Sequence, residues 1–187
     1  LKMKRLISAN PSEILQMDAK ELKQSILASE GRVVLSENVV TRETFVGDIT
    51  NSEIARAFGA DMILLNCFDV FDPKIYALDR TGNQVIQRLH ELVGCPIGVN
   101  LEPVDHSAKM LEQMQEIAAG RIASVETFKR IEELGFDFVC LTGNPGTGVS
   151  NREIIKAVQT AKENFSGLII AGKMHGAGVN EPVAELS

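Results

Sequence analysis

The stretches FGADMILLN (58–66) and LGFDFVCLT (134–142) decide the fold class of this chain. In each stretch a glycine, Gly59 or Gly135, ends a helical pattern, and an apolar run follows almost at once. Glycine commonly ends helices because it adopts the left-handed conformation without strain. A continuous apolar run is typical of a strand that is covered on both faces. Both stretches therefore predict a helix that leads directly into a buried strand.

The same unit recurs along the chain. Apolar runs between turn signals predict five strands, at 32–36, 62–65, 96–99, 136–141 and 167–171. Helical spacing of apolar residues predicts helices at 11–29, 52–59, 84–93, 108–119, 125–134 and 152–164. Strands that alternate with helices indicate an α/β fold with a parallel sheet.

Two architectures fit this alternation, a TIM-type (β/α)8 barrel and a doubly wound open sheet. Each predicted strand ends in polar residues, whereas an open sheet concentrates such residues at one switch point. We therefore predict the barrel, with residues 1–187 as a single domain that holds its first five strand–helix units and is truncated at the C-terminus. Because five units leave strand edges exposed, we also expect a homo-oligomer. The open sheet is the alternative.

Composition narrows the function classes. The net charge of -6 and the scattered Lys and Arg residues argue against nucleic-acid binding, which needs clustered positive charge. We find neither an apolar stretch of membrane-spanning length nor a signal-peptide core, so we expect a cytoplasmic protein with no membrane partner. The three cysteines, Cys67, Cys95 and Cys140, form no metal or disulfide pattern and are interpreted as small buried hydrophobic residues.

Barrel active sites lie in the loops that follow the strands. Thirteen polar residues occupy those positions: Ser36, Glu37, Asn38, Asn66, Asp69, Asn100, Glu102, Asp105, His106, Thr142, Asn144, Lys173 and His175. The functional hypothesis is that they converge on one site. The structural alternative is that loops are polar because they are exposed.

Three carboxylates, Glu37, Asp69 and Glu102, come from successive strand ends. Together they could hold Mg²⁺, with Asp69 and Glu102 as metal ligands, or could act in acid–base catalysis, with Glu37 and Glu102 as catalytic residues. The alternative is that they cap helices and form loop salt bridges.

The run GNPGTG (143–148) is a glycine-rich loop between a strand and a helix. Backbone N–H groups beside a helix N-terminus suit a phosphate or carboxylate. We predict an anion site there, formed by Thr142, Gly143, Asn144, Gly146, Gly148 and, from the following turn, Gly176. The alternative is a tight turn that uses glycine for positive φ.

The segment AGKMHGAG (171–178) follows the fifth predicted strand and contains Lys173 and His175. A buried lysine could form a Schiff base, with His175 carrying protons, or could hold an anion as a plain charge. We predict both residues to be catalytic. The third histidine, His90, lies in a predicted helix and is expected to be solvated on its face.

The run LTGNPGTGVSNREIIKAVQTAKENFSGLIIAGKMHGAGVNEP (141–182) is similar to the photosystem I biogenesis protein BtpA family, and more loosely to phosphate-binding TIM barrels. Lys173-Met-His175 departs from that family's second glycine turn. The chain also resembles uncharacterised bacterial phosphoenolpyruvate-phosphonomutase-like barrel proteins. The Lys-x-x-x-Cys-Gly-His loop of that enzyme group is absent, so its catalysis is not carried over.

Two functions follow as expectations. The first is a lyase-like or aldolase-like barrel enzyme, with Mg²⁺ as its candidate cofactor, that acts on a small phosphorylated or carboxylate metabolite. A hydrolase is less well supported because the chain has no G-x-S-x-G motif. The second is a non-enzymatic assembly or regulatory protein, as the BtpA resemblance implies.

Overall fold

The structure is a computed structural model, and it describes residues 4–78, 82–110 and 113–172. The strands are β1 (Leu35–Val39), β2 (Met62–Asn66), β3 (Ile97–Leu101), β4 (Phe138–Leu141) and β5 (Leu168–Ala171). The α-helices are α1 (Pro11–Ile14), α2 (Ala19–Ala28), α3 (Asn51–Ala57), α4 (Val85–Val93), α5 (Val125–Leu134) and α6 (Asn151–Asn164). Three short 3-10 helices are η1 (Leu6–Ser8), η2 (Gly82–Gln84) and η3 (Ala119–Arg121).

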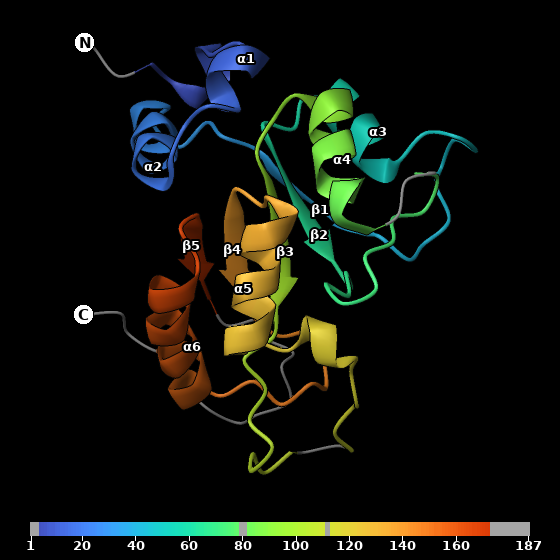
Figure 1. Ribbon diagram of the computed structural model, residues 1–187, viewed down its shortest axis with the longest axis vertical. Helices are drawn as coiled ribbons and strands as arrows, with labels where there is room; N and C mark the ends of the chain where they lie inside the picture. Colours follow the sequence, from blue (N-terminus) through green and yellow to red (C-terminus); the bar gives the residue numbers. More distant parts are fainter. Residues whose placement is uncertain (1–3, 79–81, 111–112, 173–187) are drawn as a thin grey trace.

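The five described strands form one parallel sheet in the order β1-β2-β3-β4-β5 (Figure 1). The prediction of an α/β fold with a parallel sheet is confirmed. Each strand from β2 to β5 pairs with the strand that precedes it in the chain, so the described sheet contains no reversal of strand order. A doubly wound sheet binds its ligand at such a reversal.

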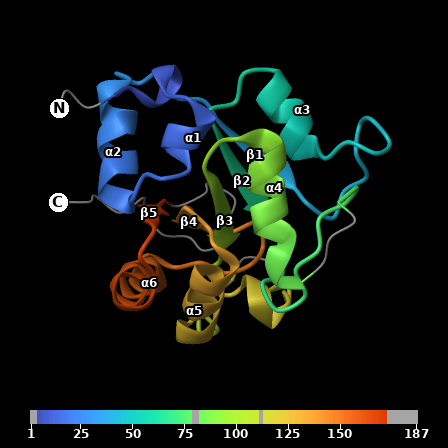
Figure 2. The same cartoon turned by 45° about the horizontal axis from the view of Figure 1, so that its top comes forward.

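The two faces of the sheet are covered by different helices. On one face, Ile63, Ile97 and Val139 pack in a core cluster with residues of α4, α5 and α6. On the other face, Met62 and Phe138 pack with residues from η1, α1 and α2. Figure 2 shows the resulting arrangement, with α3 to α6 around one side of the sheet and α1 and α2 on the other. We call the α1–α2 side the inner face.

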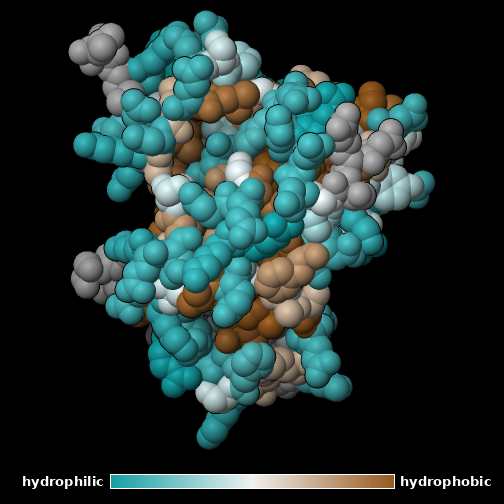
Figure 3. All heavy atoms as spheres, viewed as in Figure 1, coloured by the Kyte–Doolittle hydropathy of each residue, from teal (hydrophilic) through white to brown (hydrophobic). Residues whose placement is uncertain are grey.

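The helices form because one side of each is apolar and their ends are capped. Ser124 accepts a hydrogen bond from the Thr127 N–H in a capping box at the start of α5. Gly94 and Gly135 end α4 and α5 in the left-handed conformation, at φ of 59° and 81°. The outward side chains of the helices are mainly hydrophilic (Figure 3). Packing of the apolar sides against the sheet therefore fixes where the helices lie.

The edge strands are less covered than the central ones. All five residues of β2 and of β3 are buried, whereas no residue of β1 or β5 is fully buried. Leu35 on β1, for example, is 39% exposed. The apolar runs of the central strands therefore match the two-sided burial that the sequence indicates.

Two helix predictions are wrong, one in extent and one in kind. The stretch 11–29 contains two helices because Asp18 is extended and accepts a hydrogen bond from the Glu21 N–H at 2.8 Å, which starts α2 as a new helix. Within 108–119, no described residue before Ala119 is helical. The Gln115 N–H donates instead to the Gly146 carbonyl at 2.9 Å, so tertiary contacts override the helical spacing there.

The first strand lies three residues later than predicted, at 35–39 instead of 32–36. Val34 precedes the strand, and its N–H donates to the Asp61 carboxylate at 2.9 Å. Glu37 therefore lies within β1. The register of β1 with β2 aligns Glu37 with Leu64, which places both side chains on the inner face.

Gly98 of β3 packs closely against the ring of Phe138. A Cβ at this position would lie 2.2 Å from the ring of Phe138, which is fully buried. Gly98→Ala should therefore lower the free energy of unfolding by about 1–3 kcal/mol, because a packed core resists added volume. Urea unfolding measures the change.

The matched control is Gly47→Ala, since a Cβ on Gly47 meets nothing within 4 Å. Its effect should lie within about 0.5 kcal/mol of zero. Equal stability of the wild type and the Gly98→Ala variant would contradict the packing of Phe138 on this strand.

Candidate functional site

A cluster of polar side chains lies at the carboxyl end of the sheet. Glu37 comes from β1, Asn66 from β2, Glu102 from just after β3, and Asn144 from just after β4. Asn66 and Glu102 are only 5% and 1% exposed, whereas Glu37 is exposed. Four sequence-separated strands therefore bring these groups together, and one carboxylate remains open to solvent. We call these four residues, with Arg121, the carboxyl-end cluster.

Hydrogen bonds join the cluster into one continuous chain. The Asn66 Nδ2 donates to Glu37 Oε1 at 2.7 Å and to Asn144 Oδ1 at 2.8 Å. In return, the Asn144 Nδ2 donates to Asn66 Oδ1 at 3.0 Å and to Glu102 Oε1 at 2.8 Å. Because each amide nitrogen faces a carboxylate, the orientation of both amides is determined by their neighbours.

Glu102 is the most buried member and has the most donors. Its Oε1 accepts from Arg121 Nη2 at 2.8 Å, and its Oε2 accepts from the Asn144 backbone N–H at 2.8 Å. The Arg121 side chain is 20% exposed. A carboxylate this deeply buried needs a cation and several hydrogen bonds to remain charged. Arg121 and Asn144 supply them.

Asn100 of β3 lies beside this cluster and is 4% exposed. Its side-chain amide nitrogen lies 3.0 Å from the carbonyl oxygens of both Cys140 and Thr142 when it is oriented toward acceptors. Asn100 therefore holds the end of β4, from which the glycine-rich loop departs. The side chain of Thr142 itself is half-buried.

The glycine-rich loop is held by contacts within the protein. Gly146 and Gly148 have φ of 76° and 75°, which disfavours any other residue. A Cβ on Gly143 would lie 2.4 Å from Val149 Cγ2. The glycines are thus required by the turn, and the carboxylate that the loop binds is that of Glu102. Binding of an external anion by this loop stays a prediction.

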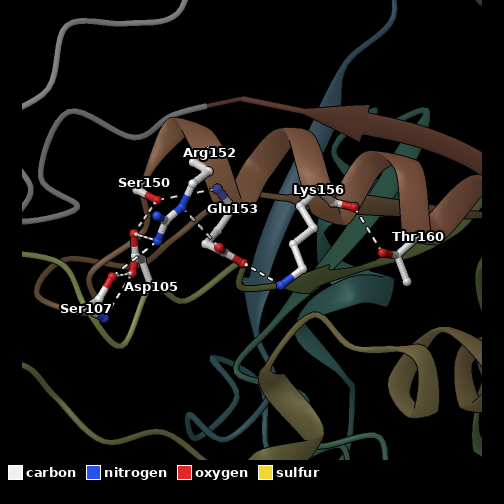
Figure 4. A network of polar contacts seen from close by, with 7 residues as sticks. All are labelled: Asp105, Ser107, Ser150, Arg152, Glu153, Lys156 and Thr160. Atoms are coloured by element: carbon white, nitrogen blue, oxygen red, sulfur yellow. Dashed lines mark hydrogen bonds and ion pairs between the residues drawn. The ribbon is translucent and has the colours of Figure 1, made fainter.

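Asp105 ties the loop after β3 to the start of α6 (Figure 4). It accepts hydrogen bonds from the Ser107 Oγ at 2.6 Å and the Ser150 Oγ at 2.8 Å, and pairs with Arg152 at 3.1 Å. Its own N–H donates to the Gly148 carbonyl at 2.8 Å. The hydrogen bond from Ser107 is the main cause that lowers the pKa of the Asp105 carboxyl to about 2.

This pKa sets a pH dependence. The folded-state pKa of Asp105 lies below its ordinary value of 3.8, so its contribution to stability is complete above that value and is lost as the pH falls toward about 2. Asp105→Asn should lower the free energy of unfolding by about 1–3 kcal/mol at pH 7. The gap between variant and wild type should narrow between about pH 4 and pH 2, measured by urea unfolding across that range.

Asp48→Asn is the control, because Asp48 is an exposed loop residue. Its stability should follow the wild type at each pH. An Asp105→Asn variant whose deficit is constant from pH 7 to pH 2 would show that the carboxylate charge does not hold this loop.

Two other predicted site residues, Asp69 and His106, form no hydrogen bond with the carboxyl-end cluster in the described structure. Asp69 Oδ1 accepts the backbone N–H groups of Phe71 and Asp72 at 2.9 and 3.3 Å, so it organises its own turn. His106 is exposed. Within 4–78, 82–110 and 113–172, no group of three or more His, Cys, Asp or Glu side chains is arranged to hold a metal ion. Mg²⁺ binding by Asp69 and Glu102 stays a prediction. Lys173, His175 and Gly176 lie outside the described residues.

His90 is not solvated, contrary to the expectation from sequence. Its Nε2 lies 2.6 Å from Asp137 Oδ2, and its side chain is 16% exposed. The same Asp137 oxygen accepts the Ile97 N–H at 2.7 Å. This pair lies at the amino ends of β3 and β4, at the opposite end of the sheet from the cluster. Its contacts are structural.

Two of the three thiols are unreactive by environment. Burial raises the pKa of Cys95 to about 12, and burial followed by the charge of Glu37 raises the pKa of Cys140 to about 11. The thiolate is the nucleophilic form. Cys140 is therefore protonated at neutral pH and does not act as a nucleophile beside Glu37.

A thiol count tests this. At pH 8 in the native protein, Cys95 and Cys140 should react with an aromatic disulfide reagent about 100-fold more slowly than after unfolding, because little thiolate is present. The Cys67→Ser variant isolates these two thiols. Rapid reaction of that variant in its native state would contradict their burial.

Sequence reasoning missed Arg121 and Ser150. Arg121 ends η3 and reaches Glu102 across 19 residues of chain. Ser150 caps α6 and donates to Asp105 across 45 residues. Neither follows a strand directly. Only the serine carried a local signal, its position before the helix that begins at Asn151.

A hollow of about 230 Å³ lies elsewhere, between α5 and α6. Its lining includes Val104, Phe128 and Lys156, and none of its lining residues belongs to the carboxyl-end cluster. We place the candidate site at the cluster because buried, mutually bonded polar groups are costly and specific, whereas an open hollow between helices is a common packing feature.

Residues 7–187 match the family described as Domain of unknown function (DUF7916). The chain belongs to the DUF7916 family. No curated protein sequence matches this DUF7916 chain.

Two solved structures are similar in part. One is a β-L-arabinopyranosidase from Geobacillus stearothermophilus in complex with arabinose, with a TM-score of 0.44 and 11% identity over 79% of this chain and 52% of that chain. The other is a protein from Bacillus halodurans assigned as an alpha-N-acetylgalactosaminidase, with a TM-score of 0.41 and 11% identity over 83% of this chain and 51% of that chain. The DUF7916 chain thus spans about half the length of each.

Proposed function

We propose that the five strand–helix units of this chain are part of a (β/α)8 barrel. The uninterrupted parallel order from β1 to β5 supports this, because a barrel adds strands in sequence around one wall. The partial exposure of β1 and β5 also supports it, because in a closed barrel both edge strands would pair with further strands. The carboxyl-end cluster then lies at the end of the barrel where active sites occur.

On that basis we propose an enzyme that acts on a small anionic metabolite, phosphorylated or carboxylate, with lyase-like chemistry. One observation carries the proposal: an exposed carboxylate, Glu37, is bonded through Asn66 and Asn144 to the buried Glu102–Arg121 ion pair. Such a network costs stability unless fully satisfied, and it holds its outermost group in one geometry.

The two glutamates of the cluster differ in exposure, and we propose different roles for them. Glu37 can reach a substrate and transfer a proton, because it is exposed and oriented by Asn66. Glu102 holds Asn144 and the glycine-rich loop, so in this proposal it positions other groups. The raised pKa of the Cys140 thiol disfavours covalent chemistry by this thiol. In this proposal Glu37 transfers a proton. Lys173 and His175 are proposed to complete the site from the loop after β5.

A thermal-shift screen with Mg²⁺, inorganic phosphate, phosphoenolpyruvate and pyruvate tests the proposal. A ligand at 100 times its dissociation constant should stabilise the fold by about 2.7 kcal/mol. Glu37→Gln should change the shift for any metabolite that binds, because Glu37 lies at the exposed end of the site and its charge acts on a bound anion.

Glu43→Gln is the matched control, since Glu43 is an exposed glutamate in the loop after β1. It should respond like the wild type. If no metabolite stabilises the protein, or if Glu37→Gln responds as the wild type does, the enzyme proposal is wrong and the non-enzymatic, BtpA-like alternative is favoured.

A further inference from the structure

Arg121 has a buried donor that is left over. Its Nη2 donates to Glu102 at 2.8 Å, but its Nε is buried and has no hydrogen-bond partner among the residues that the structure describes. Guanidinium groups commonly bind oxyanions with Nε–H and one Nη–H as a parallel pair. A buried N–H without an acceptor is costly, so a leftover donor in a functional cluster calls for an explanation. Glu102 thus accepts a hydrogen bond from the Arg121 Nη2 but not from the Nε.

Asn144 adds two donors to the same carboxylate. Its backbone N–H and its Nδ2 both lie 2.8 Å from oxygens of Glu102. Arg121 and Asn144 therefore supply four donor groups, two from each residue. The Glu102 carboxylate accepts hydrogen bonds from three of them, and the fourth is the Arg121 Nε–H. A phosphate or a substrate carboxylate has the same charge and the same kind of acceptor oxygens. The donor set is therefore that of an oxyanion site.

We propose that Arg121 and Asn144 form an oxyanion subsite that Glu102 occupies in the ligand-free protein. An oxyanion of the ligand, from a phosphate or a carboxylate, exchanges with the Glu102 carboxylate and takes the Arg121 Nε–H as well. Burial of the Nε atom fits this exchange, because a ligand reaches a buried donor only when a neighbouring group moves, and in this proposal that group is Glu102. The released Glu102 is then a carboxylate near the bound ligand.

This inference rests on the proposed function, since it names the part of the site that holds the anionic end of the substrate. It also explains why a glycine-rich loop is paired with a buried glutamate. The loop presents the Asn144 N–H to a carboxylate, and the protein supplies one of its own. An internal carboxylate is at high effective concentration, so it keeps adventitious anions out of the subsite.

Titration calorimetry with inorganic phosphate, at constant ionic strength, tests the exchange. Glu102→Gln removes the competing charge and should bind phosphate at least ~10-fold more tightly than the wild type, because the internal carboxylate no longer competes for the same donors. Arg121→Gln, added to Glu102→Gln, should abolish that binding. Acetate, titrated in parallel, shows whether the subsite also takes a carboxylate.

Arg130→Gln is the matched control. Arg130 is also 20% exposed, but it bonds to the Val70 carbonyl, Asn83 and Glu133 outside the cluster. Added to Glu102→Gln, it should leave phosphate binding unchanged. Equal phosphate affinity of the wild type and Glu102→Gln overturns the proposal, as does an equal loss in the Arg121 and Arg130 variants.

If Glu102→Gln does not fold, the wild type provides the measurement. Saturable phosphate-dependent shifts of the Arg121 Nε–H and Asn144 amide NMR signals support the exchange, and the absence of saturable shifts overturns it. The two proposals fail separately. If phosphate binding depends on Arg121 but not on Glu37, the oxyanion subsite is supported and the enzyme proposal is wrong. If ligand binding depends on Glu37 but not on Arg121, the enzyme proposal is supported and the oxyanion subsite is wrong.

Discussion

The buried carboxylate of Glu102 holds the end of this sheet together. It is 1% exposed and accepts hydrogen bonds from Arg121 and from two groups of Asn144. A single charge of this kind fixes three segments at once: the end of β3, the turn η3, and the loop after β4. Removal of one partner would leave an uncompensated buried charge, which typically costs about 3–5 kcal/mol. The orientation of Asn144, and through it of Asn66 and Glu37, depends on this carboxylate.

The class of fold was predictable because it depends on local patterns. Gly135 before the run of β4 and the continuous apolar residues of β2 and β3 indicated helices that lead into buried strands, and the parallel sheet bears this out. The sequence could not show that the helix expected at 108–119 does not form, because the apolar residues there have helical spacing. The contact of Gln115 with Gly146, far away in the sequence, decides its conformation.

The candidate site was predictable in part for the same reason. Strand ends of a parallel sheet meet at one edge, so Glu37, Glu102 and Asn144 could be expected near one another. Which carboxylate is buried could not be predicted, because Glu37 and Glu102 look alike in sequence. Arg121 could not be found at all from strand ends, since it reaches the cluster from a short turn. Burial separates the two glutamates, and only the packed structure shows it.

The order of the strands has a consequence for how the protein assembles. Each strand from β2 to β5 pairs with the strand before it, so each new strand–helix unit adds to the edge of the sheet that the preceding units form. Pairing between neighbours in sequence keeps loop-closure entropy low compared with a sheet whose order is shuffled. A chain synthesised from its N-terminus can therefore extend this sheet one unit at a time as it leaves the ribosome. The two hydrogen bonds from Asn144 to Glu102 cannot form until the loop after β4 has emerged, so the carboxyl-end cluster is completed late in that sequence.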